Sequence, residues 1–255
     1  MHADQILAQL NEQQREAVTS SGNNVMVVAG AGSGKTRVLV HRIAWLIAVE
    51  QTPPQNIFAV TFTNKAAKEM SSRVSEILGY ESKGMWIGTF HGIAHRFLRL
   101  HWSDSGLDQN FQILDADDQL RQIKKIIKEN SFDESRYPPK EITWFINSQK
   151  DLGLRPNKSK GKKGLEHYLE IYDAYEKLCR QNHLVDFGEL LLRFYETLKN
   201  SEPLLRHYQN RFENILVDEF QDTNEIQYKI IKLLTGDRGR AFIVGDDDQS
   251  IYRWR

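Results

Sequence analysis

The sequence of 255 residues predicts an α/β fold, in which a parallel β-sheet carries an inserted all-helical subdomain. Two observations support this prediction. Short apolar runs, typical of buried strands, alternate with amphipathic helical patterns in the first and last parts of the chain, as in parallel α/β sheets. The stretch between them, residues 91–213, has helical patterns and no convincing strand.

Five runs are predicted to form the strands, because each is continuously apolar and bounded by turn-forming residues. They are residues 24–30, 57–62, 85–90, 214–219 and 241–246. Apolar stripes predict helices between them, at residues 38–47, 66–77 and 226–234, and Gly79 is the expected C-cap of the second. We therefore assign residues 1–90 and 214–255 to the sheet domain and residues 91–213 to the insertion.

The prediction of a helical insertion is based on three further apolar stripes. They lie at residues 120–127, 165–179 and 187–194, and proline, glycine and charged residues predict loops at 136–139 and 155–164.

Composition narrows the class of protein. Lys and Arg together number 34, as do Asp and Glu, so a contact with nucleic acid would need a local basic patch. The single cysteine, Cys179, excludes a disulfide framework and favours a reducing, cytoplasmic setting. No apolar run approaches the ~18 residues of a membrane span, so we expect no membrane partner.

The segment AGAGSGKTR, residues 29–37, follows the first predicted strand and opens a helix. Gly30, Gly32 and Gly34 allow backbone N–H groups to surround an anion, with a lysine and a threonine for phosphate and Mg²⁺. The strict pattern has glycine where this chain has Ala29. A glycine-rich turn without a ligand is the alternative, but the order of strand, loop and helix favours nucleotide binding.

Two adjacent carboxylates, Asp218 and Glu219, end the fourth predicted strand. The carboxyl ends of parallel strands form the ligand-binding edge of an open sheet. Hydrolysis of a phosphoanhydride needs a carboxylate for Mg²⁺ and a base for water. We assign Asp218 to the metal and Glu219 to the water, on the expectation that neighbouring strand residues point to opposite sides. A solvated acidic strand end is the alternative.

The last eleven residues, GDDDQSIYRWR, combine carboxylates, an amide, aromatics and arginines. Gln249 would lie near a γ-phosphate, and Tyr252 and Trp254 could stack on unpaired bases. The segments TFTNK (61–65) and GTFHG (88–92) end neighbouring strands with similar side chains. Buried aromatics at strand ends are the alternative for each segment alone. A guanine-specific Asn-Lys-x-Asp and an ABC-type Ser-Gly-Gly signature are absent from the sequence.

Seven motifs in order resemble the superfamily 1 DNA helicases of the UvrD/PcrA/Rep group, in their N-terminal portion. They are LNEQQREAV (10–18), AGAGSGKTRVLVHR (29–42), AVTFTNKAAKEM (59–70), GTFHGIAHR (88–96), LVDFGELLL (184–192), VDEFQDTN (217–224) and GDDDQSIYRWR (245–255). This resemblance implies a RecA-like P-loop NTPase domain, discontinuous in sequence and incomplete at its C-terminus.

The resemblance also implies roles for individual residues, with ATP and Mg²⁺ as cofactors. ATP would be bound by Gln14, which reads adenine, and by Ala29, Gly30, Ala31, Gly32, Ser33, Gly34, Lys35, Thr36 and Arg37. Catalysis would use Lys35, Asp218, Glu219 and Gln249, with Thr36 and Asp218 holding Mg²⁺. Single-stranded DNA would contact Phe62, Asn64, His91, Tyr252 and Trp254.

The implied activity is ATP-dependent 3′-to-5′ translocation on single-stranded DNA, with DNA junctions as substrates, repair as the usual setting and repair proteins as possible partners. The family's motor has a second RecA-like domain that closes on ATP and is missing from this chain, so we expect the natural protein to be longer. Two alternatives remain. The chain could bind ATP and DNA with weak or no turnover, or belong to a helicase–nuclease.

Overall fold

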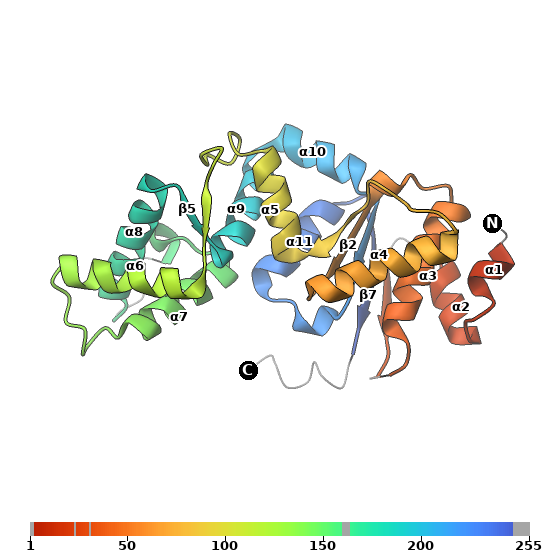
Figure 1. Cartoon of the computed structure of the whole chain (residues 1–255), viewed down its shortest axis with the longest axis horizontal. Coiled ribbons are helices and arrows are strands. Elements are labelled where there is room, and N and C mark those ends of the chain that lie inside the picture. Colours follow the sequence, from red (N-terminus) through yellow and green to blue (C-terminus); the bar gives the residue numbers. More distant parts are fainter. Residues whose placement is uncertain (1–2, 23, 31, 160–163, 247–255) are drawn as a thin grey trace. The chain divides into compact units, whose positions relative to one another are not determined.

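The computed structural model describes residues 3–22, 24–30, 32–159 and 164–246. The chain forms two compact units, and each is described here by itself. Unit 1 comprises residues 1–93, 201–223 and 230–255, and unit 2 comprises residues 94–200 and 224–229. Figure 1 labels their helices and strands. Residues 91–93 and 201–213, which the sequence analysis placed in the insertion, therefore group with the sheet unit, whereas residues 224–229 group with unit 2.

Unit 1 contains a five-stranded parallel sheet, which confirms the predicted α/β class. Its strands are β1 (Asn24–Val28), β2 (Ile57–Thr61), β3 (Trp86–Thr89), β6 (Asn214–Val217) and β7 (Arg240–Gly245). Their order in the sheet is β1-β7-β6-β2-β3. All five predicted strands exist, each ending one or two residues earlier than its apolar run. Because the five strands are parallel, all of them end at the same edge of the sheet.

Unit 1 also holds several helices. They are α1 (Ala3–Leu7), α2 (Glu12–Thr19), α3 (Lys35–Ala48), the short η1 (Pro54–Asn56), α4 (Asn64–Leu78), α10 (Glu202–Arg211) and η3 (Phe220–Asp222). The helices α5 (Phe90–Leu100) and α11 (Glu225–Thr235) contribute residues to both units.

The sheet has an apolar layer on each face. On one face, side chains of α1 to α4 pack with alternate residues of the strands in one buried cluster. On the other face an aromatic group joins β2 and β3 to α10. It comprises Phe58, Trp86, Tyr208 and Phe212, with ring centroids 5.1 to 5.7 Å apart. These layers fix the strands whose ends carry the candidate site.

The expectation that all five runs form buried strands is wrong for β1. This strand is at the edge of the sheet, and its residues alternate between exposed and half-buried. Met26 is 61% exposed and Val28 49% exposed. An apolar run does not distinguish a central strand from an edge strand, because that difference depends on which elements cover it.

The boundaries of α4 follow from its terminal residues. The Thr63 hydroxyl accepts a hydrogen bond from the Ala66 N–H at 3.1 Å, which caps the N-terminus. Gly79 ends the helix in the left-handed conformation, with a φ of 76°. Its N–H donates to the Ser75 carbonyl, as expected for a glycine C-cap.

Unit 2 is largely helical. Besides most of α5 it contains α6 (Ala116–Glu129), α7 (Pro139–Asp151), η2 (Pro156–Ser159), α8 (Glu166–Gln181) and α9 (Phe187–Asn200). The three apolar stripes predicted from the sequence lie on α6, α8 and α9. Buried residues of α6 and α8 form one core with those of α7, and Leu190, Leu191 and Phe194 of α9 are also buried. Phe187, at the start of α9, is 50% exposed.

The expectation that residues 91–213 contain no strand is wrong. The strands β4 (Gln112–Leu114) and β5 (Leu184–Asp186) form a two-stranded parallel sheet in unit 2. Each has three residues, which is too short for the period-two alternation that identifies a strand in sequence.

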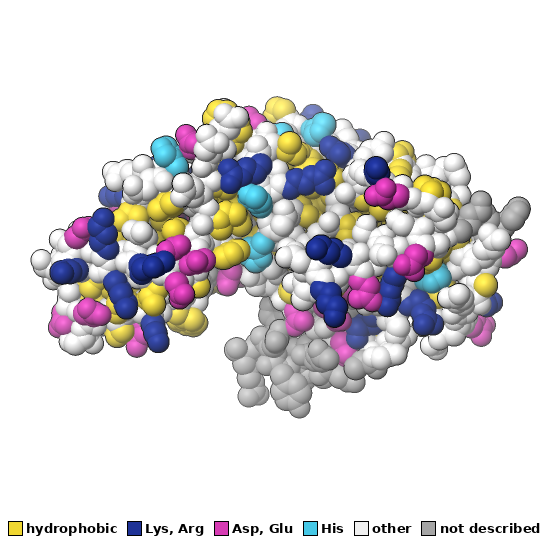
Figure 2. Space-filling model, in the orientation of Figure 1, with side chains coloured by type: hydrophobic (Ala, Val, Ile, Leu, Met, Phe, Trp, Pro, Cys, Tyr) yellow, Lys and Arg dark blue, Asp and Glu magenta, His cyan; other side chains and the backbone are white. Residues whose placement is uncertain are grey.

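The surface is mixed in charge. Figure 2 shows Lys and Arg side chains gathered over the part of the surface formed by α6, with acidic side chains among them. Among the described helices, none combines the length and the hydropathy that crossing a bilayer requires.

Candidate nucleotide site at the carboxyl edge of the sheet

The phosphate loop connects β1 to α3. Gly32 and Gly34 have φ values of 76° and 84°, in the left-handed region that glycine adopts without strain. Gly34 also leaves room for Gln14, because a Cβ at this position would lie 2.9 Å from the Gln14 amide nitrogen. The helix begins directly after Gly34, so its first N–H groups have no partners within the helix and face the loop.

Lys35 is buried in the loop, with all three ammonium hydrogens engaged. Its Nζ donates to the carbonyl oxygens of Ala29 at 3.0 Å and Gly30 at 3.2 Å. The third contact is an ion pair with Oδ2 of Asp246 at 3.2 Å. A lysine has three donors, so these partners satisfy it fully. The lysine predicted to bind phosphate is therefore held by the protein itself.

Asp246 is a residue of this site that the sequence analysis did not identify. It follows β7, which pairs with β1 on one side and β6 on the other, and its side chain is 3% exposed. The sequence does show three consecutive aspartates at the end of the fifth predicted strand, and they could have been considered as site residues. Choosing among these three aspartates required the order of strands in the sheet.

Asp218 and Glu219 follow β6, as predicted, but strand alternation does not separate them. Asp218 continues the ladder through its N–H, which donates to the Val60 carbonyl at 3.0 Å. Glu219 has a left-handed backbone with a φ of 48°. The turn after the strand therefore sets the direction of Glu219. The expectation that the two side chains point to opposite sides because they are neighbours on a strand is wrong.

Burial shapes the electrostatics of Asp218. Loss of solvent, and then the neighbouring charge of Glu219, raise the pKa of Asp218 to about 6. Hydrogen bonding from the Glu219 N–H and the charge of Lys35 oppose this increase in pKa. Negative charge is thus in local excess at the end of β6, and a cation would relieve it.

Gln221 connects the two acidic strand ends. Its Nε2 donates to Oε2 of Glu219 at 2.7 Å, and its Oε1 accepts from the N–H of Asp246 at 3.0 Å. Gly245 permits this approach, since a Cβ there would lie 3.3 Å from the same Oε1. A hydrogen-bonded path therefore leads from Lys35 through Asp246 and Gln221 to Glu219.

Gln14 lies beside the phosphate loop. Its N–H and side chain form a capping box with Asn11 at the start of α2. Its Nε2 also donates to the Ser33 carbonyl at 3.0 Å, which ties α2 to the loop. Thr36 is half-buried in the first turn of α3, and Arg37 is exposed.

Three of the residues expected to contact DNA lie at the ends of β2 and β3. These strands are neighbours, with Thr61 opposite Thr89. The Phe62 ring is half-buried against Phe90, with centroids 6.2 Å apart. Asn64 is exposed at the start of α4. Burial lowers the pKa of His91, which favours the neutral imidazole.

Four predicted site residues lie outside the part of the chain that the structure describes. They are Ala31, Gln249, Tyr252 and Trp254. Their assignments stay predictions.

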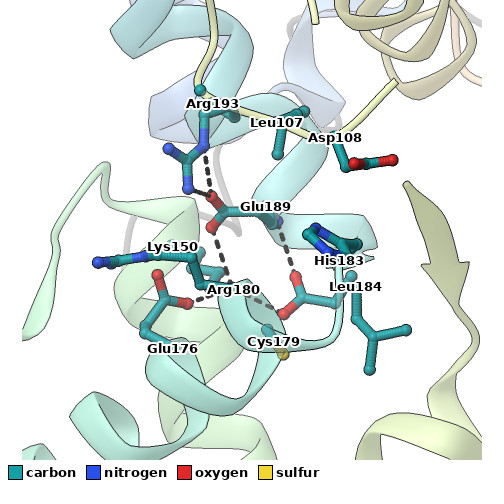
Figure 3. A pocket seen from close by; sticks show the side chains of 12 residues that line it. Leu107, Asp108, Lys150, Glu176, Cys179, Arg180, His183, Leu184, Glu189 and Arg193 are labelled. Atoms are coloured by element: carbon teal, nitrogen blue, oxygen red, sulfur yellow. Dashed lines mark hydrogen bonds and ion pairs between the residues drawn. The ribbon is translucent and has the colours of Figure 1, made fainter. Parts of the chain in front are cut away.

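A cavity of about 40 Å³ is present in unit 2, and it is lined by charged side chains (Figure 3). Lys150 lies beside it, 1% exposed, with Nζ at 2.7 Å from Asp186, 2.8 Å from Glu176 and 3.2 Å from Glu189. Arg155 adds ion pairs to both glutamates and to Glu196. The cations and carboxylates form one network of ion pairs in this core. In the described part of the chain no group of three His, Cys, Asp or Glu could hold a metal.

Comparison with known proteins identifies the family. Residues 10–255 match the family model described as the UvrD/REP helicase N-terminal domain. The chain is 56% identical over 257 residues to DNA helicase II of Escherichia coli and 54% identical over 261 residues to that of Haemophilus influenzae. It is 43% identical over 256 residues to ATP-dependent DNA helicase PcrA of Bacillus subtilis.

These alignments cover 99–100% of the chain but only 35–36% of the relatives, so the chain spans about a third of their length. The match to the family model covers well over half of the chain. By its sequence, and with a parallel sheet that fits a RecA-like domain, the chain belongs to the UvrD/REP helicase N-terminal domain family.

Proposed function

We propose that this chain is the ATP-binding N-terminal portion of an ATP-dependent DNA helicase that moves 3′ to 5′ on single-stranded DNA. One observation carries the proposal. A lysine in a phosphate loop and a buried carboxylate lie at the same edge of the sheet, after strands β1 and β6, which are separated by β7. Adjacent strands are about 4.8 Å apart, so the two strand ends are about 10 Å apart, which suits a nucleotide phosphate chain with its metal.

The residues present fit Mg²⁺ as a cofactor. Burial and then the neighbouring charge of Glu219 raise the pKa of Asp218, and a divalent cation binds favourably beside two such carboxylates. Mg²⁺ commonly takes one or two protein oxygens together with phosphate oxygens and water. Asp218 and the Thr36 hydroxyl would supply the protein oxygens. Bound there, the metal would neutralise charge that develops on the phosphates.

Glu219 would orient the attacking water. Its carboxylate is half-buried and accepts a hydrogen bond from Gln221, which limits its rotamers. A positioned carboxylate near a phosphate can take a proton from water in the transition state. Gln249 would report the γ-phosphate to the segment that follows it.

Phe62, Asn64 and His91 support a contact with single-stranded DNA. The strands that precede them, β2 and β3, end beside each other, so an aromatic face, an amide and a neutral imidazole are grouped at one edge. Stacking and hydrogen bonding of this kind bind unpaired bases without strong sequence preference. Tyr252 and Trp254 would extend this platform.

The proposal extends to a longer protein with a second motor domain, because the chain covers about a third of its relatives. Repair of DNA in the cytoplasm is the setting we propose. The alternatives are binding without turnover by this part of the protein, or a place in a helicase–nuclease.

Equilibrium titration tests the binding part of the proposal. The 255-residue chain is expected to bind MgATP, MgADP and a fluorescent single-stranded oligonucleotide. Steady-state ATPase with and without the oligonucleotide then separates turnover from binding alone. Strong stimulation by DNA would indicate a complete motor, and slow or no turnover would indicate that a second domain is needed. A protein that binds neither nucleotide nor DNA would contradict the proposal.

The basic face of α6 supports binding to the duplex part of a DNA junction. Arg121, Lys124, Lys125 and Lys128 are all exposed. At 100° per residue they fall within an arc of about 100° on one side of the helix. Arg121 is paired with Asp118 and Lys125 with Glu129, so the face carries acids as well.

Replacing Lys124 and Lys128 with glutamine is expected to weaken junction binding. If both contact phosphates, the slope of log affinity against log salt falls by about two, since each contact contributes about 0.9. Binding to a single strand should change less. The matched control replaces Lys177 and Lys199, two exposed lysines of unit 2, with glutamine. Equal salt slopes in both pairs of variants would show that the α6 face is only solvated.

A further inference from the structure

We infer that Asp246 is a latch on the phosphate loop. It holds Lys35 in a nucleotide-free position, and a nucleotide must displace it. The inference rests on the proposed nucleotide site and goes beyond it, because it assigns a competing role to a residue outside the predicted binding set. The contact between the Lys35 ammonium and the Asp246 carboxylate is the observation that motivates it.

Competition follows from the number of donors on the lysine. Each of the three N–H bonds of Lys35 already has an oxygen partner in the protein. A phosphate oxygen can be bound only if one of those partners is released or shares its hydrogen. The two carbonyls belong to the loop itself, whereas the carboxylate belongs to another strand.

Burial strengthens the Asp246 contact. The Lys35 and Asp246 side chains are 9% and 3% exposed. Water screens such a pair poorly, so the carboxylate competes effectively with an incoming anion. A nucleotide with two or three phosphates brings more charge than one carboxylate and can displace it. A single phosphate group is a weaker competitor.

Breaking the contact between Lys35 and Asp246 would also affect Glu219, the carboxylate proposed to orient water. The backbone N–H of Asp246 donates to Gln221, whose amide donates to Glu219. A shift of Asp246 as Lys35 leaves it would therefore alter the hydrogen bond that orients Glu219. Asp246 acts through these neighbours and through Lys35, so it is a positioning residue.

The test is a double-mutant cycle with Asp246→Asn and Lys35→Ala, read out as affinity for ADP without Mg²⁺ and with it. Asp246→Asn alone is expected to tighten ADP binding roughly threefold to tenfold, because the competition is removed. In the Lys35→Ala background the same change should have little effect. Asp237→Asn, an exposed aspartate of the same unit, should leave affinity unchanged in both backgrounds.

The other outcomes of the cycle are distinct. Equal tightening in both backgrounds would mean simple repulsion between Asp246 and phosphate, and would overturn the latch. Weaker binding only with Mg²⁺ would make Asp246 a metal ligand, and would also overturn it. If the unaltered protein binds no ADP, the proposed function fails rather than the latch alone.

A second measurement does not depend on affinity. In nucleotide-free protein, Lys35 should react slowly with an acylating reagent relative to exposed Lys177, as measured by mass spectrometry of peptides. Asp246→Asn should increase the Lys35 rate several-fold, because the ammonium loses its charged partner, and Asp237→Asn should not. An unchanged Lys35 rate in Asp246→Asn would overturn the inference.

Discussion

Replacement of Lys35 with alanine is expected to weaken binding of MgATP by about 10- to 150-fold, as expected for loss of a hydrogen bond between charged groups of about 1.5–3 kcal/mol. The lysine is the buried cation of the phosphate loop, at the start of α3. Its removal leaves the β- and γ-phosphates without a point charge at this position. ATPase activity should fall with binding.

Isothermal titration of ATP into the variant measures this effect, and circular dichroism shows whether the fold is retained. Lys68→Ala is the matched control, because Lys68 is an exposed lysine of the same unit, on α4. Unaltered ATP affinity in a folded Lys35→Ala protein would mean that the loop does not bind phosphate. If the variant unfolds, Asp246→Asn added to it removes the unpaired carboxylate and permits the measurement.

Replacement of Lys150 with methionine is expected to destabilise the protein by about 3–5 kcal/mol, the usual loss when one partner of a buried ion pair is removed. The Lys150 ammonium lies among the carboxylates of Glu176, Asp186 and Glu189, all nearly or fully inaccessible to water. Methionine fills a similar volume but leaves these charges uncompensated. Such a loss is a large fraction of the ~5–15 kcal/mol typical of folded domains.

Urea unfolding followed by circular dichroism measures the loss. Lys177→Met is the control, since the Lys177–Asp173 pair lies on the exposed surface of α8 and should contribute less than about 1 kcal/mol. Adding Glu176→Gln to Lys150→Met should recover part of the stability, because one buried negative charge is removed. A midpoint for Lys150→Met equal to that of Lys177→Met would show that the network does not stabilise unit 2.

Many features of this protein could be predicted from residues that are neighbours in the sequence. The phosphate loop is contiguous, and its left-handed glycines, its lysine and the helix behind it follow from neighbouring residues. Gly79 and the apolar stripe of α4 are read in the same way. The short strands β4 and β5 could not be predicted in this way, because three residues are too few to show the alternation of apolar and polar side chains. The exposure of β1 could not be predicted from the sequence either, because the burial of a strand depends on segments far away in the chain.

By itself the sequence determined the α/β class, the five strands of the sheet, the phosphate loop and the acidic end of β6. Each depends on residues within about one helix or strand of one another. Only the tertiary structure decided which charges meet. Lys35 and Asp246 are 211 positions apart, and they pair because β7 lies next to β1. Likewise Lys150 is polar in sequence and fully buried in the fold, because carboxylates from α8, β5 and α9 surround it. Coulomb attraction acts through space, so such partners are fixed by the order of strands and the packing of helices rather than by spacing along the chain.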